Sequence, residues 1–61
     1  MKAKFTMASG QVVTVDATPE IREQIREEIN TAESIQFHEG DWRLILMTGR
    51  IESVEFIRTH G

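Results

Sequence analysis

The chain has no cysteine and only one proline among its 61 residues. Without cysteine, neither a disulfide nor a thiolate-bound zinc can stabilise the fold. A chain of this length forms one domain, residues 1–61, which buries only about 60% of the surface that its unfolded form exposes. Association is the remaining way to gain stability, so we expect a homo-oligomer.

Long hydrophobic runs are also missing. No segment approaches the ~18 apolar residues of a membrane span, and the stretch MKAKFTMASGQ has no continuous apolar region of signal-peptide length. The lack of cysteine fits a reducing compartment. We therefore predict a cytoplasmic protein with no membrane partner.

Residues that carry chemistry are scarce. The sequence has no cysteine nucleophile, no glycine-rich loop to cradle phosphate and no histidines at metal-ligating spacing. It therefore predicts a protein that is not an enzyme and that holds no metal or cofactor.

Basic charge is in deficit, and the net charge is -3. Between residues 19 and 33, five acidic residues against two arginines give -3, and in the rest of the chain five basic residues balance five acidic ones. A protein that binds duplex DNA normally presents a basic surface, because phosphate contacts supply much of its affinity. Double-stranded DNA is therefore disfavoured as a partner.

Two alternating segments open the chain, KAKFTMA and QVVTVDA, with Ser9-Gly10 between them. Alternation of apolar and polar residues is typical of half-buried strands, and glycine supplies the positive φ that a tight turn demands. The first 17 residues therefore predict a β-hairpin.

The next segment, ATPE, predicts the start of a helix, because Thr18 can cap the free amides and proline fits the first helical position. We expect the helix to run from about Pro19 to Ala32. Its apolar stripe, formed by Ile21, Ile25 and Ile29, is wide enough to cover only one face of a small sheet.

The last part of the chain contains three more strand patterns, SIQFHE, WRLILM and RIESVEFI. The turns EGD and Thr48-Gly49 separate them, so they predict an antiparallel meander. A bulge near Glu52 and Ser53 would restore a single apolar face to the final strand. The order strand, strand, helix, strand, strand, strand predicts an α+β fold: a small antiparallel sheet or partly closed barrel, with one helix packed on one face.

The stretch DWRLILMTGR carries four consecutive apolar residues, so both faces of its strand need cover. The helix covers one face of this strand, so Ile45 and Met47, together with Ile57 or Ile51, are left without cover. Either the sheet bends into a small barrel that buries them, or they meet a second copy. We predict Ile45, Met47 and Ile57 as the interface of an oligomer.

The solvent side of the helix is acidic, with Glu23, Glu27 and Glu28 along its flank. Such a flank could attract a basic surface on another protein, whereas its plain alternative is a solvated face. We predict these three residues as a partner-binding surface.

The single tryptophan, Trp42, stands next to Arg43, with Arg50 at the other end of the same strand. An indole that stacks on a base, beside guanidinium groups that hold phosphate, is one way to bind a nucleotide or single-stranded RNA. Packing of the indole in a core or interface is the competing interpretation.

Two stretches, Ser9-Gly10 with Val15 and the segment Ile51 to Glu55, give the chain a resemblance to a loose class of small phage and prophage proteins of Gram-positive bacteria. The resemblance spans most of the chain. It implies a phage origin and a role in host takeover or evasion of host defence, and it supplies no site residue. The leading hypothesis is a non-enzymatic, phage-encoded protein that oligomerises and binds or blocks a host macromolecule. The alternative is a module that binds RNA or sequesters a signalling nucleotide through Trp42, Arg43 and Arg50.

Overall fold

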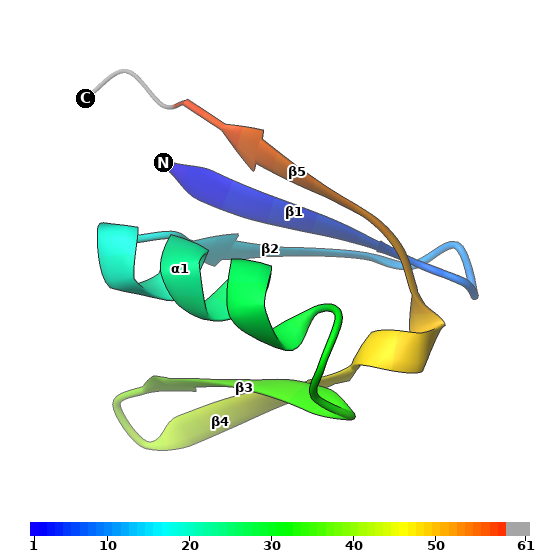
Figure 1. Ribbon diagram of the computed structural model, residues 1–61. Coiled ribbons are helices and arrows are strands. Elements are labelled where there is room, and N and C mark those ends of the chain that lie inside the picture. The colour runs from blue at the N-terminus through cyan, green and yellow to red at the C-terminus, as the bar shows by residue number, and fades with distance from the viewer. Residues whose placement is uncertain (59–61) are drawn as a thin grey trace.

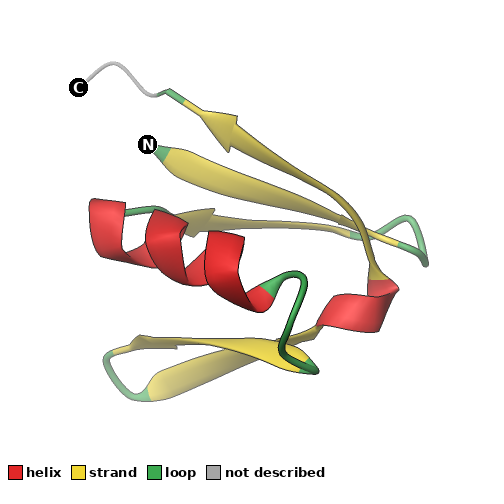
Figure 2. Ribbon diagram, viewed as in Figure 1, coloured by secondary structure: helices red, strands yellow, loops and turns green. Residues whose placement is uncertain are grey.

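The computed structural model describes the backbone of residues 1–58 and, except at positions 39 and 42, their side chains. The fold is a small α+β domain with antiparallel sheets, as the sequence predicts. Figure 1 shows the arrangement, and Figure 2 marks the helices and strands by colour. Along the chain the elements are β1 (Lys2–Met7), β2 (Val12–Asp16), α1 (Pro19–Glu28), β3 (Ser34–Glu39), β4 (Trp42–Met47), a 3-10 helix (Thr48–Arg50) and β5 (Ile51–Ile57).

Two separate sheets replace the single sheet or partly closed barrel expected from the sequence. One has the strand order β2-β1-β5, the other is the β3–β4 hairpin, and the described strands do not close into a barrel. In the view of Figure 1, α1 lies between the three-stranded sheet and the hairpin. Along the chain, α1 lies between the β1–β2 hairpin and the β3–β4 hairpin. The two hairpins do not pair with each other, so each sheet has two edge strands.

The β1–β2 hairpin forms where the alternating pattern predicts it. Its antiparallel register runs from Lys2 opposite Asp16 to Thr6 opposite Val12. The Met7 amide donates to the carbonyl of Gln11 (2.8 Å), and Gly10 adopts a φ of 92° in the turn. The positive φ explains the glycine, because a side chain at this position would be strained.

The final strand contradicts the expected meander, because β5 pairs with β1 and not with β4. Thr48–Arg50 forms a 3-10 helix instead of a tight reversal, and Gly49 has no positive φ. The Ala8 amide donates to the carbonyl of Arg50 (2.7 Å). This bond holds the start of β5 beside the end of β1, so the strand runs back along β1.

The predicted bulge in β5 is confirmed. Thr6 lies opposite Ser53 whereas Met7 lies opposite Ile51, so Glu52 is an extra residue without a partner in the ladder. The insertion lets Ile51 and Val54, which alternation would place on opposite faces, both pack against the core.

Helix α1 begins as predicted. The hydroxyl of Thr18 accepts from the amide of Ile21 (3.2 Å), and Pro19 occupies the first helical position. The helix ends at Glu28, short of the predicted Ala32. The hydroxyl of Thr31 donates to the carbonyl of Glu27 (2.6 Å), so a side chain satisfies a carbonyl at the helix end.

The core lies between the inner faces of the two sheets and α1. The rings of Phe5 and Phe37 meet with centroids 5.8 Å apart and planes inclined by 51°. Ile25 is the fully buried member of the isoleucine stripe, and Ile21 and Ile29 are partly buried against the same core. The buried residues of the described chain are Ala3, Phe5, Ala17, Ile25, Ile35, Phe37 and Leu46.

We predict that Thr18→Ala lowers the free energy of unfolding by about 1 kcal/mol, because an amide at the start of α1 loses its acceptor. Urea unfolding followed by circular dichroism measures the difference. Thr18→Ser keeps the oxygen and should retain most of the stability. Equal losses in both variants would contradict the capping role.

Candidate interaction surface

The β3–β4 hairpin divides the apolar residues of β4 between two faces. Its register runs from Ser34 opposite Met47 to Glu39 opposite Trp42. Leu46 is buried and Leu44 packs partly against the core, so both face inward. The alternate residues of the two strands form the hairpin outer face, which consists of Ser34, Gln36, His38, Arg43, Ile45 and Met47.

The two apolar members of the hairpin outer face are strongly exposed, Ile45 at 49% and Met47 at 48%. The barrel that would have buried them is therefore wrong. Their cross-strand neighbours are the polar residues Gln36 and Ser34. Ile45 and Met47 thus form a small apolar pair in a polar surround, as the sequence predicts for the residues that the helix leaves uncovered.

Ile57, the third predicted interface residue, lies elsewhere. It is 41% exposed and sits opposite Lys2 in the three-stranded sheet. Lys2 forms an ion pair with Asp16 across the β1–β2 ladder, and this hydrogen bond holds the pKa of the Asp16 carboxyl below its usual value. The structure therefore separates Ile57, beside charged residues, from Ile45 and Met47, and Ile51 packs against the core instead.

The outer edge of β4 exposes backbone as well as side chains. The amide of Thr48 donates to the carbonyl of Glu33 (3.0 Å), which continues the β3–β4 ladder by one pair. Because backbone groups alternate in direction along an antiparallel strand, Arg43, Ile45 and Met47 direct their N–H and C=O groups away from β3. Among the described residues no strand pairs with that edge.

The outer edge of β3, in contrast, is covered by the helix. The side-chain amide of Gln24 in α1 donates to the carbonyl of Gln36 (3.1 Å). This contact agrees with the backbone directions given above. The carbonyl of Gln36 points out of the hairpin, as do the backbone groups of Ile45, which lies opposite Gln36. Of the two edges of this hairpin, the one formed by β4 is the more accessible.

The predicted acidic surface on α1 is partly free. Glu23 and Glu27 are exposed on the side of the helix away from the buried Ile25. Glu28 is half-buried, and its carboxylate accepts from the side chain of Gln24 (3.2 Å). The structure therefore leaves Glu23 and Glu27 open to a partner and engages Glu28 within the chain.

The two arginines of the nucleotide hypothesis lie in different elements. Arg43 is exposed on the hairpin outer face, whereas Arg50 is exposed in the 3-10 helix after the strand. Four residue steps of strand, about 14 Å, separate Arg43 from Met47, and Arg50 follows in the 3-10 helix. The side chain of Trp42 lies outside what the structure describes.

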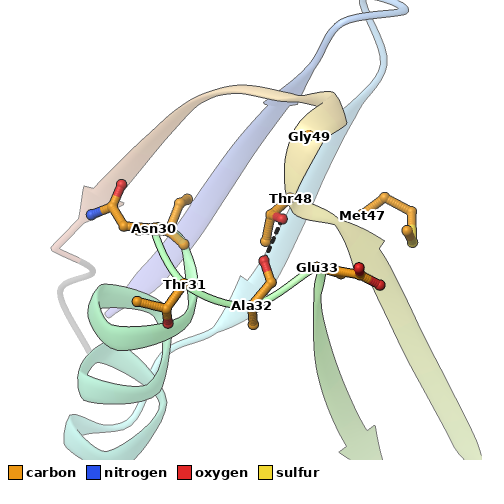
Figure 3. A pocket seen from close by; sticks show the side chains of 8 residues that line it. Asn30, Thr31, Ala32, Glu33, Met47, Thr48 and Gly49 are labelled. Carbon is orange, nitrogen blue, oxygen red and sulfur yellow. Dashed lines mark hydrogen bonds between the residues drawn. The ribbon is translucent and has the colours of Figure 1, made fainter.

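A shallow hollow of about 480 Å³ adjoins the end of β4 (Figure 3). The hydroxyl of Thr48, one of its lining residues, donates to the carbonyl of Ala32 (2.6 Å), which ties the loop after α1 to the end of the hairpin. Met47 lies at its rim and points away from this bond. Sequence reasoning missed this junction, for which a threonine before a glycine was the only signal. The lining residues are Ile29, Asn30, Thr31, Ala32, Glu33, Met47, Thr48 and Gly49.

Within the described part of the chain, no group of three or more histidine, cysteine, aspartate or glutamate side chains could hold a metal ion. No helix in that part is long and apolar enough to span a membrane. No family model, curated protein or solved structure matches the chain.

We expect Thr48→Val to lower the free energy of unfolding by about 1 kcal/mol, because the part-buried carbonyl of Ala32 loses a donor. Thr48→Ser keeps the hydroxyl and serves as the matched control. Chemical denaturation of the two variants and the parent measures the effect. If valine is tolerated as well as serine, the hydroxyl does not hold the junction together.

Proposed function

We propose that this chain is a non-enzymatic interaction protein that associates with itself through the hairpin outer face. The observation that carries the proposal is the exposure of Ile45 and Met47, next to each other on one face of a strand with a free edge. Exposed apolar residues that lie together mark surfaces of association. A domain of this length also has little core of its own to stabilise it.

The two side chains alone do not account for a stable assembly. Complete burial of an isoleucine or methionine contributes about 1.5–3 kcal/mol, so covering a half-exposed side chain contributes about 1 kcal/mol. Two copies would gain about 4 kcal/mol from Ile45 and Met47, whereas a micromolar dissociation constant requires about 8 kcal/mol. Further contacts must therefore accompany these residues, and the free backbone groups of β4 are next to them.

The second part of the proposal concerns a different macromolecule. Glu23 and Glu27 are exposed on the far side of α1 from the core, where a basic surface of another protein can approach. Opposite charges across an interface mainly accelerate encounter. We propose a host protein as this partner, which the assembly binds or blocks in the cytoplasm. The nucleotide hypothesis gains no support from the separate positions of Arg43 and Arg50.

We predict that the parent chain sediments as a species heavier than its 7.0 kDa monomer at micromolar concentration and that Ile45→Asp makes it monomeric. A carboxylate in a dry interface loses its hydration and finds no partner there. Analytical ultracentrifugation measures the mass, and circular dichroism checks the fold.

Val12→Asp is the matched control, because Val12 is an equally exposed apolar residue (50%) on the other sheet. This variant should assemble like the parent chain. A parent chain that is monomeric at micromolar concentration would contradict the proposed self-association. An assembled Ile45→Asp variant would show that the hairpin outer face is not the interface.

We also predict that the double change Glu23→Lys and Glu27→Lys leaves the fold intact but slows association with the captured partner. Exposed helix charges contribute only a few tenths of a kcal/mol to stability. The effect should shrink as salt is raised, because screening weakens attraction between exposed charges. Pull-down from a bacterial lysate, followed by binding kinetics on the captured protein, measures it.

The control carries the same change of charge on the three-stranded sheet, Glu52→Lys with Glu55→Lys, where both side chains are exposed on β5. This variant should bind at nearly the parent rate. Equal rates for both double variants and the parent would mean that the acidic flank of α1 is a solvated surface.

A further inference from the structure

We infer that a second copy adds to the free edge of β4 in antiparallel orientation, with the two Ile45 residues facing each other on the two-fold axis. The product is one four-stranded sheet with the order β3-β4-β4-β3. This inference rests on the proposed self-association and specifies its geometry and its contacts.

The edge offers the hydrogen-bonding groups that a further strand needs. Every second residue of β4 directs one N–H and one C=O away from β3; these residues are Arg43, Ile45 and Met47. The direction follows from the bond of the Thr48 amide to Glu33 on the β3 side and from the outward carbonyl of Gln36, which bonds to Gln24. Among the helices and strands of the described residues, Figure 1 shows none that runs along β4 on the side away from β3. An antiparallel edge of this kind is complementary to itself, because each residue presents both a donor and an acceptor.

Strand length selects the register. With Ile45 on the axis, Arg43 faces Met47 of the second copy and Ile45 faces Ile45, so all outward-directed residues of Trp42–Met47 are used. An axis at Leu46 would place Arg43 opposite Gly49, which belongs to the 3-10 helix. An axis at Leu44 would place Met47 opposite Asp41, which lies in the turn before β4.

The side chains fit this register. Both Ile45 side chains meet on the same face of the extended sheet, with one Met47 diagonally on each side. The aliphatic part of Arg43 lies against Met47 of the second copy while its guanidinium remains in water. The two copies of Arg43 are four positions apart along the strands, about 14 Å, so their repulsion is weak.

The other described edges carry features that disfavour strand addition. On β2 the exposed Val12 shares its face with Thr14 and Asp16, and Asp16 is held by an ion pair. On β5 the bulge at Glu52 interrupts the regular edge. Charges and bulges are common protection for edge strands, and the centre of β4 has neither.

Cysteine cross-linking tests the register, and the chain itself contains no cysteine to interfere. Ile45→Cys should form a covalent dimer on oxidation or with a short bismaleimide, because facing residues have Cα atoms about 5.5 Å apart. The dimer is seen as a doubled mass in the absence of reductant. Met47→Cys alone should not cross-link, whereas a mixture of Met47→Cys and Arg43→Cys should. Val12→Cys is the matched control and should remain monomeric under denaturing conditions.

A backbone variant tests the hydrogen bonds separately. Ile45→Pro removes the outward N–H without removing a bond of the β3–β4 ladder, so it should abolish assembly in sedimentation while the circular dichroism spectrum persists. Ile45→Val keeps the N–H and should assemble like the parent chain. An assembled Ile45→Pro variant would overturn strand addition at this edge.

The outcomes separate the inference from the proposed function. If the parent chain assembles, but the Met47→Cys variant cross-links by itself and the Ile45→Cys variant does not, the register is overturned and self-association remains. A monomeric parent chain would remove both. Efficient cross-linking of Val12→Cys in place of Ile45→Cys would transfer the interface to β2.

Discussion

The contact between Phe5 and Phe37 is the interaction on which the rest of the structure depends. Phe5 belongs to β1 and Phe37 to β3, and their ring centroids lie 5.8 Å apart. The described strands share no ladder between the two sheets, so side-chain packing must hold the sheets together. A buried phenylalanine typically accounts for about 3–5 kcal/mol, a large part of the about 5–15 kcal/mol that stabilises a whole domain.

Packing the inner faces together has a direct consequence for the outer ones. Ile35, Phe37 and Leu46 of the hairpin are committed to the core, and the alternation of strands places Ile45 and Met47 on the opposite side. The one α-helix among the described residues lies on the inner side, so no described element is left to cover them. The same shortage leaves the backbone edge of β4 without a strand. An apolar pair and an open edge thus arise together from one architectural cause.

The junction around Thr48 determines which edges stay open. Thr48 bonds to Glu33 through its amide and to Ala32 through its hydroxyl, and Arg50 accepts from Ala8 near the end of β1. These contacts direct the chain away from β4 and place β5 on the far sheet. If β5 had returned beside β4, it would have filled the edge that is now free. The surface proposed for association therefore depends on a turn that lies outside it.

The sequence by itself determined the local features of this protein, because local rules govern them. The capping by Thr18, the turn at Gly10, the bulge at Glu52 and the opposite faces of Leu46 and Ile45 follow from dihedral preferences and from alternation along one strand. Such rules operate within a few residues, so they can be applied before the fold is known.

Only the tertiary structure decided which distant segments meet. Alternation along the last strand indicates that Ile57 faces outward, but it does not say to which sheet the strand belongs. The glycine after Thr48 suggested a tight turn back along β4, whereas the chain forms a 3-10 helix there and the carbonyl of Arg50 bonds to Ala8. Helix α1 likewise ends at Glu28, before the Ala32 that the sequence suggested, and the Thr31 hydroxyl bonds to the carbonyl of Glu27 there. Strand partners are chosen by the burial that the whole chain achieves, and that sum over distant contacts leaves no local signal in the residues that make it.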